Sequence, residues 1–275
     1  MHMNRKIRIG IIGCGAIGSS LAKIIKKDFK ARAHVAAIFD IDEKKSFTLA
    51  RKLGYNNVVV QSRRDLIKRA DLVIEATHMK FAYDIAKDAI SSSKDIMIMS
   101  VGGIVARYKS LVQLAKRKKS KIYIPSGAVC GIDGLKALAF AKIKKVKLTT
   151  TKPVKSFDGV EFVKKRFGAL DNINRDKILF SGPAEKAIQF FPQNINVAAI
   201  LSLAGIGIKK TEICIIASPK IKKNIHNIEI DSDAGRISAR TENIPHPDNP
   251  KTSFLAVLSA TAMLKQIFEP IRLGS

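Results

Sequence analysis

Short apolar runs alternate with amphipathic segments through the first half of the chain. The run that begins at Lys6 is rich in β-branched residues and leads into glycines, after which apolar residues recur at helical spacing. Because this order of strand, turn and helix repeats, it predicts a parallel sheet with helices between its strands. Further strands are expected at residues 34–40, 57–60, 71–77, 96–103 and 121–131.

The pattern changes after residue 131. A helix is expected over 133–142 and a strand over 146–151, whereas 157–174 has little periodicity and is expected to be irregular. Later strands are separated by short turns, which favours adjacent antiparallel strands in a mixed sheet covered by helices. These later strands are expected at residues 212–217, 225–231 and 236–241.

The first strand ends in the spacing Gly13-x-Gly15-x-x-Gly18. Gly13 permits a tight turn, Gly15 lets a pyrophosphate approach the backbone, and Gly18 lets the helix pack closely on the strand. The free N–H groups and the positive dipole end of the helix favour phosphate groups. We therefore predict a dinucleotide site with contacts at Gly13, Gly15, Ala16, Ile17 and Gly18.

Asp40 ends the second expected strand, about 20 residues after Gly18. A carboxylate at this position accepts hydrogen bonds from the adenosine ribose hydroxyls, which favours NAD. Lys44 and Lys45 follow closely and can tolerate a 2′-phosphate, so the sequence leaves NADP open. The alternative role of Asp40 is to cap the next helix.

These patterns predict an α/β fold with two domains. The first, at residues 1–127, is a Rossmann-type, doubly wound parallel sheet, and the second, at 128–248, is an α+β domain with a mixed open sheet. Residues 249–275 are expected to form a C-terminal helix that packs back against the first domain. Asn249-Pro250 would begin it, with a cap and a proline in the first turn.

The chain carries 49 basic and 23 acidic side chains, a formal net charge of +26. The basic residues are spread along the sequence, and aromatic residues do not interleave with them as a nucleic-acid stacking surface requires. We interpret the charge as a solvated surface that attracts anionic small molecules, with nucleic-acid binding as the alternative. No apolar run reaches membrane-spanning length and no signal peptide is evident, so a cytoplasmic location is expected. The 3 cysteines lack metal-ligand spacing, so neither a metal site nor a disulfide framework is expected.

Few side chains in the second half suggest chemistry. His226 alternates with apolar positions on an expected strand, and on spacing alone an ordinary histidine is the simpler interpretation. Asn194 and Asn196 interrupt an apolar helix, where an amide either caps the helix or binds a nicotinamide carboxamide. A carboxylate-binding or a capping role is open to Lys251, Thr252 and Ser253.

The chain resembles the archaeal and bacterial L-aspartate dehydrogenases. The matching segments appear in the family's order and cover most of the sequence; the glycine motif is generic, whereas the other four segments together are specific. The segments are Ile-Gly-Cys-Gly-Ala-Ile-Gly18, Pro-Ser-Gly-Ala-Val-Cys-Gly131, Phe-Pro-Gln-Asn-Ile-Asn-Val-Ala-Ala199, Asn-Ile-His226 and Asn-Pro-Lys-Thr-Ser-Phe-Leu-Ala256.

This resemblance implies NAD- or NADP-dependent oxidative deamination of L-aspartate to iminoaspartate. The family's active-site histidine falls on His226 and its cofactor contacts fall on Ala128 and Asn196, so the resemblance reverses the interpretation from spacing alone. It also implies a homodimer, with catalysis and dimerisation assigned to the second domain. The two substrate carboxylates need cationic or N–H partners, for which the candidates are Lys152, Lys251, Thr252 and Ser253.

Two positions depart from the family pattern. Asn227 stands where the family often has Glu, and Thr151 stands in a segment where it often has Arg, so the sequence leaves open a substrate other than aspartate. The alternatives are a related two-domain dehydrogenase or reductase acting on another amino acid, homoserine or an imine, and a dinucleotide-sensing protein without turnover.

Overall fold

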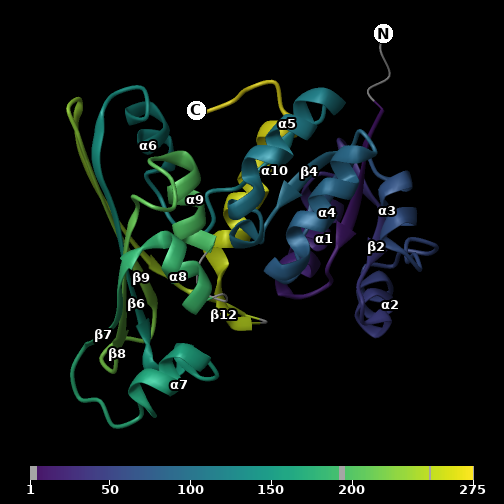
Figure 1. Cartoon of the computed structure of the whole chain (residues 1–275). Helices are drawn as coiled ribbons and strands as arrows, with labels where there is room; N and C mark the ends of the chain where they lie inside the picture. The colour runs from purple at the N-terminus through teal and green to yellow at the C-terminus, as the bar shows by residue number, and fades with distance from the viewer. Residues whose placement is uncertain (1–4, 192–195, 248, 275) are drawn as a thin grey trace. The chain divides into compact units, whose positions relative to one another are not determined.

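Two sheets of five strands each organise the chain, one in each of two units (Figure 1). The computed structural model describes residues 5–191, 196–247 and 249–274. Unit 1 comprises Met1–Pro125 and Val257–Arg272, and unit 2 comprises Ser126–Ala256 and Leu273–Ser275. No helix in the described part of the chain is long and apolar enough to cross a membrane.

The sheet of unit 1 is parallel, with strand order β2-β1-β3-β4-β5. The order reverses between β1 and β3, which is the point where doubly wound sheets bind ligands at the carboxyl ends of their strands. This matches the predicted Rossmann-type sheet. The strands are β1 (Ile7–Ile12), β2 (Ala33–Phe39), β3 (Leu72–Glu75), β4 (Asp95–Ile98) and β5 (Ile122–Tyr123).

Helices cover both faces of this sheet. Leu21 and Ile25 of the first helix pack in one core with Ile9 and Ile11 of β1. On the other face the third helix packs close to the sheet, because a Cβ on Gly10 would lie 2.5 Å from Leu66 Cδ2. The helices are α1 (Ala16–Asp28), α2 (Glu43–Lys52), α3 (Arg63–Arg69), α4 (Met79–Ser91) and α5 (Tyr108–Lys118), with 3-10 turns η1 (Val101–Gly103) and η2 (Val105–Arg107).

The strand expected at residues 57–60 is not formed. The segment contributes one parallel bridge, between Val59 and Ile38 of β2. Asn57 has a left-handed φ of 62°, which turns the chain at the start of the segment. The short apolar run therefore only touches the sheet edge.

The sheet of unit 2 is mixed, with strand order β10-β9-β6-β8-β7. The expectation that the last three strands lie side by side is wrong for the first of them. β6 lies between β8 and β9, pairing parallel with β8 and antiparallel with β9, whereas β9 and β10 do form an antiparallel neighbour pair. The strands are β6 (Ile143–Pro153), β7 (Lys177–Pro183), β8 (Glu212–Ser218), β9 (Asn224–Ser232) and β10 (Gly235–Asn243).

Helices α6 (Ile132–Leu138), α8 (Ala184–Phe190) and α9 (Asn196–Ala204) lie on one side of this sheet (Figure 1). The segment expected to be irregular begins at the last residue of a 3-10 turn, η3 (Val154–Phe157), and contains a helix, α7 (Glu161–Phe167). Phe162 of α7 stacks on Phe190 with ring centroids 4.4 Å apart. A helix of 7 residues is too short for its periodicity to stand out in the sequence, so tertiary contacts define it.

The C-terminal segment begins with a strand. β11 (Pro245–His246) pairs antiparallel with β12 (Asn249–Ser253), and α10 (Phe254–Phe268) follows, so the last helix starts at Phe254 and not at Asn249-Pro250. From Val257 onward α10 belongs to unit 1, where the Phe268 ring meets Phe29 edge-on at 5.2 Å.

Candidate active site

The glycine loop of unit 1 is shaped for close backbone contacts. Gly13 has φ 97°, and a Cβ there would lie 2.4 Å from Ala76 O at the exit of β3. A Cβ on Gly18 would lie 1.9 Å from Gly13 O, so α1 rests directly on the loop. A Cβ on Gly15 would meet no atom within 4 Å. Gly15 thus faces open space beside the first N–H groups of α1, which is what a pyrophosphate requires.

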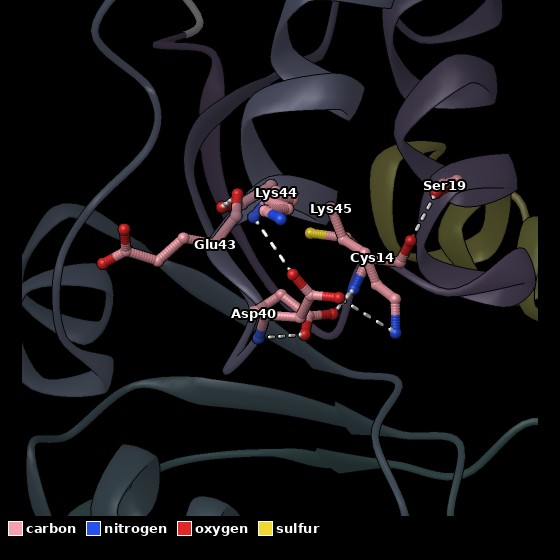
Figure 2. Close-up of polar contacts among 8 residues, drawn as sticks. Cys14, Ser19, Asp40, Glu43, Lys44 and Lys45 are labelled. Carbon is pink, nitrogen blue, oxygen red and sulfur yellow. Dashed lines mark hydrogen bonds and ion pairs between the residues drawn. The ribbon is translucent and has the colours of Figure 1, made fainter.

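Asp40 holds two backbone N–H groups at the exit of β2. Its Oδ2 accepts a hydrogen bond from Cys14 N at 2.6 Å and its Oδ1 accepts one from Asp42 N at 2.9 Å, so the carboxylate lies against the glycine loop (Figure 2). The cap of α2 is Asp42, whose side chain accepts from Lys44 N at 3.2 Å. Asp40 is therefore not that cap, and its half-buried carboxylate keeps lone pairs for a ribose hydroxyl.

The variable position in the glycine loop is a buried thiol. Burial and the Asp40 carboxylate raise the pKa of Cys14 to about 12. The carbonyl of Cys14 accepts a hydrogen bond from Ser19 Oγ at 2.9 Å, which ties the loop to α1 (Figure 2). Cys14 is thus a protonated packing residue rather than a nucleophile.

Glu75 is a fully buried carboxylate at the end of β3. Its Oε1 accepts from Thr77 N and Thr77 Oγ1, both at 2.7 Å, and its Oε2 accepts from Ser100 N at 3.0 Å. The Ser100 hydroxyl donates to Thr77 O at 2.6 Å. Burial raises the pKa of Glu75, against the opposing effect of these hydrogen bonds. The network joins the exits of β3 and β4, and sequence analysis missed it although a Glu inside an apolar strand was a signal.

In unit 2 the buried face of the sheet becomes polar toward one end. Along β6 its buried positions pass from Leu148 to Thr150 and Lys152. His226 of β9 lies opposite Thr150, and Thr241 of β10 lies opposite His226. The strand register therefore brings together residues that are far apart in the sequence.

His226 is held by a neighbour on the adjacent strand. Its Nδ1 lies 3.0 Å from Thr150 Oγ1, and the side chain is 4% exposed. Burial and, secondly, the cation of Lys152 lower the pKa of His226 to about 3. The imidazole is thus neutral at pH 7 and able to accept a proton.

Lys152 is the only buried lysine or arginine among the described residues, at 6% exposed. Burial lowers its pKa to about 8, so at pH 7 it still carries its charge. A cation in such surroundings favours an anionic ligand, because an opposite charge offsets its lost hydration.

The carbonyl of Ala128 is fixed by two side chains from β10. It accepts hydrogen bonds from Thr241 Oγ1 at 3.2 Å and from Asn243 Nδ2 at 2.9 Å. Asn196 stands exposed at the first position of α9. Asn243 was not singled out in the sequence, and its pairing with Ala128 depends on a register that the sequence does not reveal. Asn194, the other amide of that segment, lies outside the described residues.

The remaining substrate candidates lie on β12. Ser253 is 7% exposed, and within the described residues its hydroxyl has no hydrogen-bond partner. Thr252 is half-buried, and the side chain of Lys251 lies outside the part that the structure describes. A buried, unpartnered hydroxyl is costly, so Ser253 is suited to a polar ligand.

The two departures from the family pattern lie on the opposite face of the sheet. Strand alternation turns Thr151 and Asn227 away from the face that carries Thr150 and His226. Asn227 Oδ1 accepts a hydrogen bond from Arg240 Nη1 at 3.3 Å. Neither departure changes the polar end of the buried face.

Family models match both parts of the chain. The model described as "Homoserine dehydrogenase, NAD binding domain" matches residues 13–125, and the one described as "Aspartate dehydrogenase, C-terminal" matches residues 133–267.

Relatives match the chain over its whole length. It is 39% identical over 271 residues to the L-aspartate dehydrogenase of Methanosarcina barkeri, which covers 98% of this chain and 100% of the relative. The L-aspartate dehydrogenase of Methanococcoides burtonii matches with the same identity and coverage. A solved structure of an aspartate dehydrogenase from Thermotoga maritima shares the fold, with a TM-score of 0.74 at 23% identity over 98% of this chain and 100% of that one.

Proposed function

This chain belongs to the L-aspartate dehydrogenase family, and we propose that it oxidises L-aspartate to iminoaspartate with NAD or NADP. The imine then hydrolyses to oxaloacetate and ammonia, or is passed toward quinolinate in NAD biosynthesis. The observation that carries the proposal is the polar end of the buried sheet face in unit 2. There Thr150, Lys152 and His226 combine a proton acceptor with a cation for a carboxylate.

Unit 1 fits the dinucleotide. The open space at Gly15 and the N-terminus of α1 suit the pyrophosphate, and Asp40 is held where it can accept from the adenosine ribose. The negative charge of Asp40 disfavours a 2′-phosphate, which supports NAD as the preferred form. When bound, the nicotinamide supplies the hydride acceptor. Ala128 and Asn196 are the proposed contacts in unit 2, and the fixed Ala128 carbonyl supports the first.

We assign His226 the role of general acid and base. Its low pKa keeps the imidazole unprotonated, so that it can take a proton from the aspartate amine or from the water that attacks the imine. Thr150 orients the ring through the contact at Nδ1, which leaves Nε2 for the substrate.

The substrate carboxylates are assigned to Lys152 and to the β12 segment. Lys152 supplies a buried positive charge, and Ser253 supplies a hydroxyl with no partner among the described residues. Thr252 and Lys251 extend this segment. Because Thr151 and Asn227 lie on the other face, their difference from the family pattern is compatible with aspartate as substrate.

The sheet of unit 2 and the cysteines also support proposals for the assembly and the location of the protein. We infer a homodimer through the sheet face of unit 2 opposite α6, α8 and α9, because Ile178 is 59% exposed there beside half-buried Ile216. Free Cys14, Cys130 and Cys214 support a reducing compartment, the cytoplasm.

A screen of substrates with both cofactors tests the function. L-aspartate, other amino acids and homoserine are offered to the purified protein with NAD or NADP, and reduction is followed at 340 nm. We expect reduction that depends on L-aspartate, with a higher kcat/KM for NAD. His226→Ala is expected to lower turnover by about 100-fold or more while the Kd for NAD stays the same. His34→Ala, at an exposed histidine on β2, is the matched control.

The outcomes separate the alternatives. Reduction with homoserine or another amino acid, but not with aspartate, would assign the chain a different substrate. Binding of NAD without turnover of any substrate would support a dinucleotide sensor, and steeply salt-dependent binding to DNA would support the nucleic-acid interpretation of the +26 charge.

A further inference from the structure

We propose that a carboxylate bound at Lys152 makes His226 a stronger proton acceptor, so that the site turns over amino acids that carry a second carboxylate faster than those that lack one. The inference rests on the proposed dehydrogenase function and adds a physical cause for substrate selection. Lys152 thereby acts on the chemistry through His226, in addition to holding the substrate.

The strand register places the two side chains on one buried face. Thr150 and Lys152 are two residues apart on β6, so both point to the same side of the sheet. His226 lies directly opposite Thr150, and the two are joined at 3.0 Å. Lys152 is therefore the diagonal neighbour of His226, with Cβ atoms roughly 7 Å apart, within reach of a long side chain.

Among the described strand residues at this end of the face, the register adds one further ionisable group, Lys177 of β7, which does not contribute to the pKa shift of His226. Apolar residues of β8 lie directly opposite Thr150 and Lys152. On the other side of β9, neutral polar residues of β10 lie opposite the residues of β9. On β7, Lys177 faces Ala217, and its Nζ lies 5.0 Å from the ring centroid of Phe167. The residues of β8 and β10 at these positions are Ile215, Ala217, Thr241 and Asn243.

The helices on this face also bring apolar side chains. His246, the other histidine that is buried within the described part of the chain, lies on β11 with its ring edge-on to Phe254 at 5.6 Å. Among the described residues, Lys152 is thus the one charged group that acts on His226. The helical residues in the core are Leu135 of α6, Ala184 and Ala187 of α8, and Val197, Ala198 and Leu201 of α9.

The charge of Lys152 affects the protonation of His226. Burial and the Lys152 cation together lower the pKa of His226 to about 3. A histidine with such a low pKa is a weak base, because proton transfer is most effective when the pKa lies near the working pH. A carboxylate on Lys152 neutralises the nearby positive charge and removes one of the two causes, so the pKa of His226 rises toward its ordinary value of about 6.5.

The protein is therefore expected to discriminate between amino-acid substrates in the chemical step as well as in binding. L-aspartate brings the second carboxylate that offsets the charge of Lys152, whereas L-alanine and homoserine do not. These substrates are expected to lose kcat and not only to raise KM, because the base itself stays weak.

Histidine titration in the NAD-bound protein tests the coupling. The protein is labelled with 13C-histidine, the His226 signal is assigned with His226→Gln, and its protonation is followed by NMR against pH with and without succinate. Succinate is chosen as a dicarboxylate that lacks the reacting amine. The variant is Lys152→Met, and the matched control is Lys147→Met, a lysine of the same strand whose side chain lies on the opposite face.

In the wild type and in Lys147→Met, succinate is expected to raise the midpoint of His226 by about one pH unit or more. In Lys152→Met without succinate the midpoint is expected to lie above that of the wild type, succinate is expected to have no effect, and the KM for L-aspartate is expected to rise about 10-fold or more because the second carboxylate loses its cation. A midpoint that succinate does not move, or one equal in the wild type and Lys152→Met, would overturn the inference. If the wild type reduces no NAD with L-aspartate, the proposed function fails, while the titration still decides the coupling.

Discussion

Lys152 places a buried ammonium group on a sheet face whose buried neighbours are apolar or neutral polar side chains. Burial disfavours its charged form and lowers its pKa from 10.5 to about 8, a difference worth about 3 kcal/mol. A residue held at such a cost is better explained by a ligand than by the stability of the fold.

Replacing Lys152 by Met is therefore expected to stabilise the protein without ligands by up to about 3 kcal/mol at pH 7. Below pH 8 the lysine is charged in both the folded and the unfolded state, and it lowers the free energy of unfolding by the full amount. This loss of stability fades as the pH rises from 8 to 10.5, because the folded protein releases the proton before the unfolded chain does. Urea unfolding at pH 7 and pH 10 measures the difference between the wild type and Lys152→Met.

Lys147→Met, on the opposite face of the same strand, serves as the control. A variant at Lys152 that is less stable than the wild type at pH 7 would show that the lysine supports the fold.

Single residues also mark the limits of sequence analysis. The alternation around His226 predicted its strand correctly but favoured an ordinary histidine over a catalytic one. The partner that distinguishes it, Thr150, lies 76 positions away in the chain. Asn243 escaped notice for the same reason, since its contact with Ala128 spans 115 positions. Such pairs follow from strand register, which no local pattern reports.

At the scale of elements, the exits of β3 and β4 are joined through Glu75. The carboxylate accepts hydrogen bonds from Thr77 and Ser100, and Thr77 lies beside Gly13, where a Cβ would be 3.1 Å from Thr77 Cγ2. These exits lie next to the glycine loop of the same unit. Glu75 thus fixes the shape of the surface on which the dinucleotide is proposed to lie.

Glu75→Ala is expected to weaken NAD binding about 10-fold and to lower stability by about 1–3 kcal/mol, because the buried N–H groups of Thr77 and Ser100 lose their acceptor. The KM for L-aspartate should stay close to the wild-type value. Steady-state kinetics with each substrate varied, together with thermal unfolding, measure these effects. Glu229→Gln, at an exposed position of β9, is the control, and equal changes in both KM values would count against a local role for Glu75.

Elements were predictable where periodicity is long and local. The alternation of strand and helix in the first half predicted the parallel sheet, and the closely spaced strand candidates of the second half predicted β8, β9 and β10. The sequence did not predict that β6 separates β8 from β9. The length of a turn limits how far apart two strands lie, but it does not show whether a third strand lies between them. The start of the last helix was misplaced because Asn249-Pro250 has the composition of a cap, yet the segment pairs with β11.

At the scale of the whole molecule, fold and reaction were predictable from different evidence. Patterns alone predicted two α/β parts and a dinucleotide loop. The reaction came from the resemblance of segments spread along the chain, and relatives matched over 98% of its length support it. The sequence did not reveal the electrostatic coupling of His226 to Lys152, because it depends on the register in which β6 pairs with β9.

The most direct test of the account uses L-aspartate carrying deuterium at Cα. The wild type is mixed with NAD and this substrate, and the reduced cofactor is analysed by mass spectrometry. The account predicts one deuterium in each reduced nicotinamide, at a rate that falls about 100-fold or more in His226→Ala. Reduced cofactor without deuterium, or no reduction with L-aspartate, would contradict it.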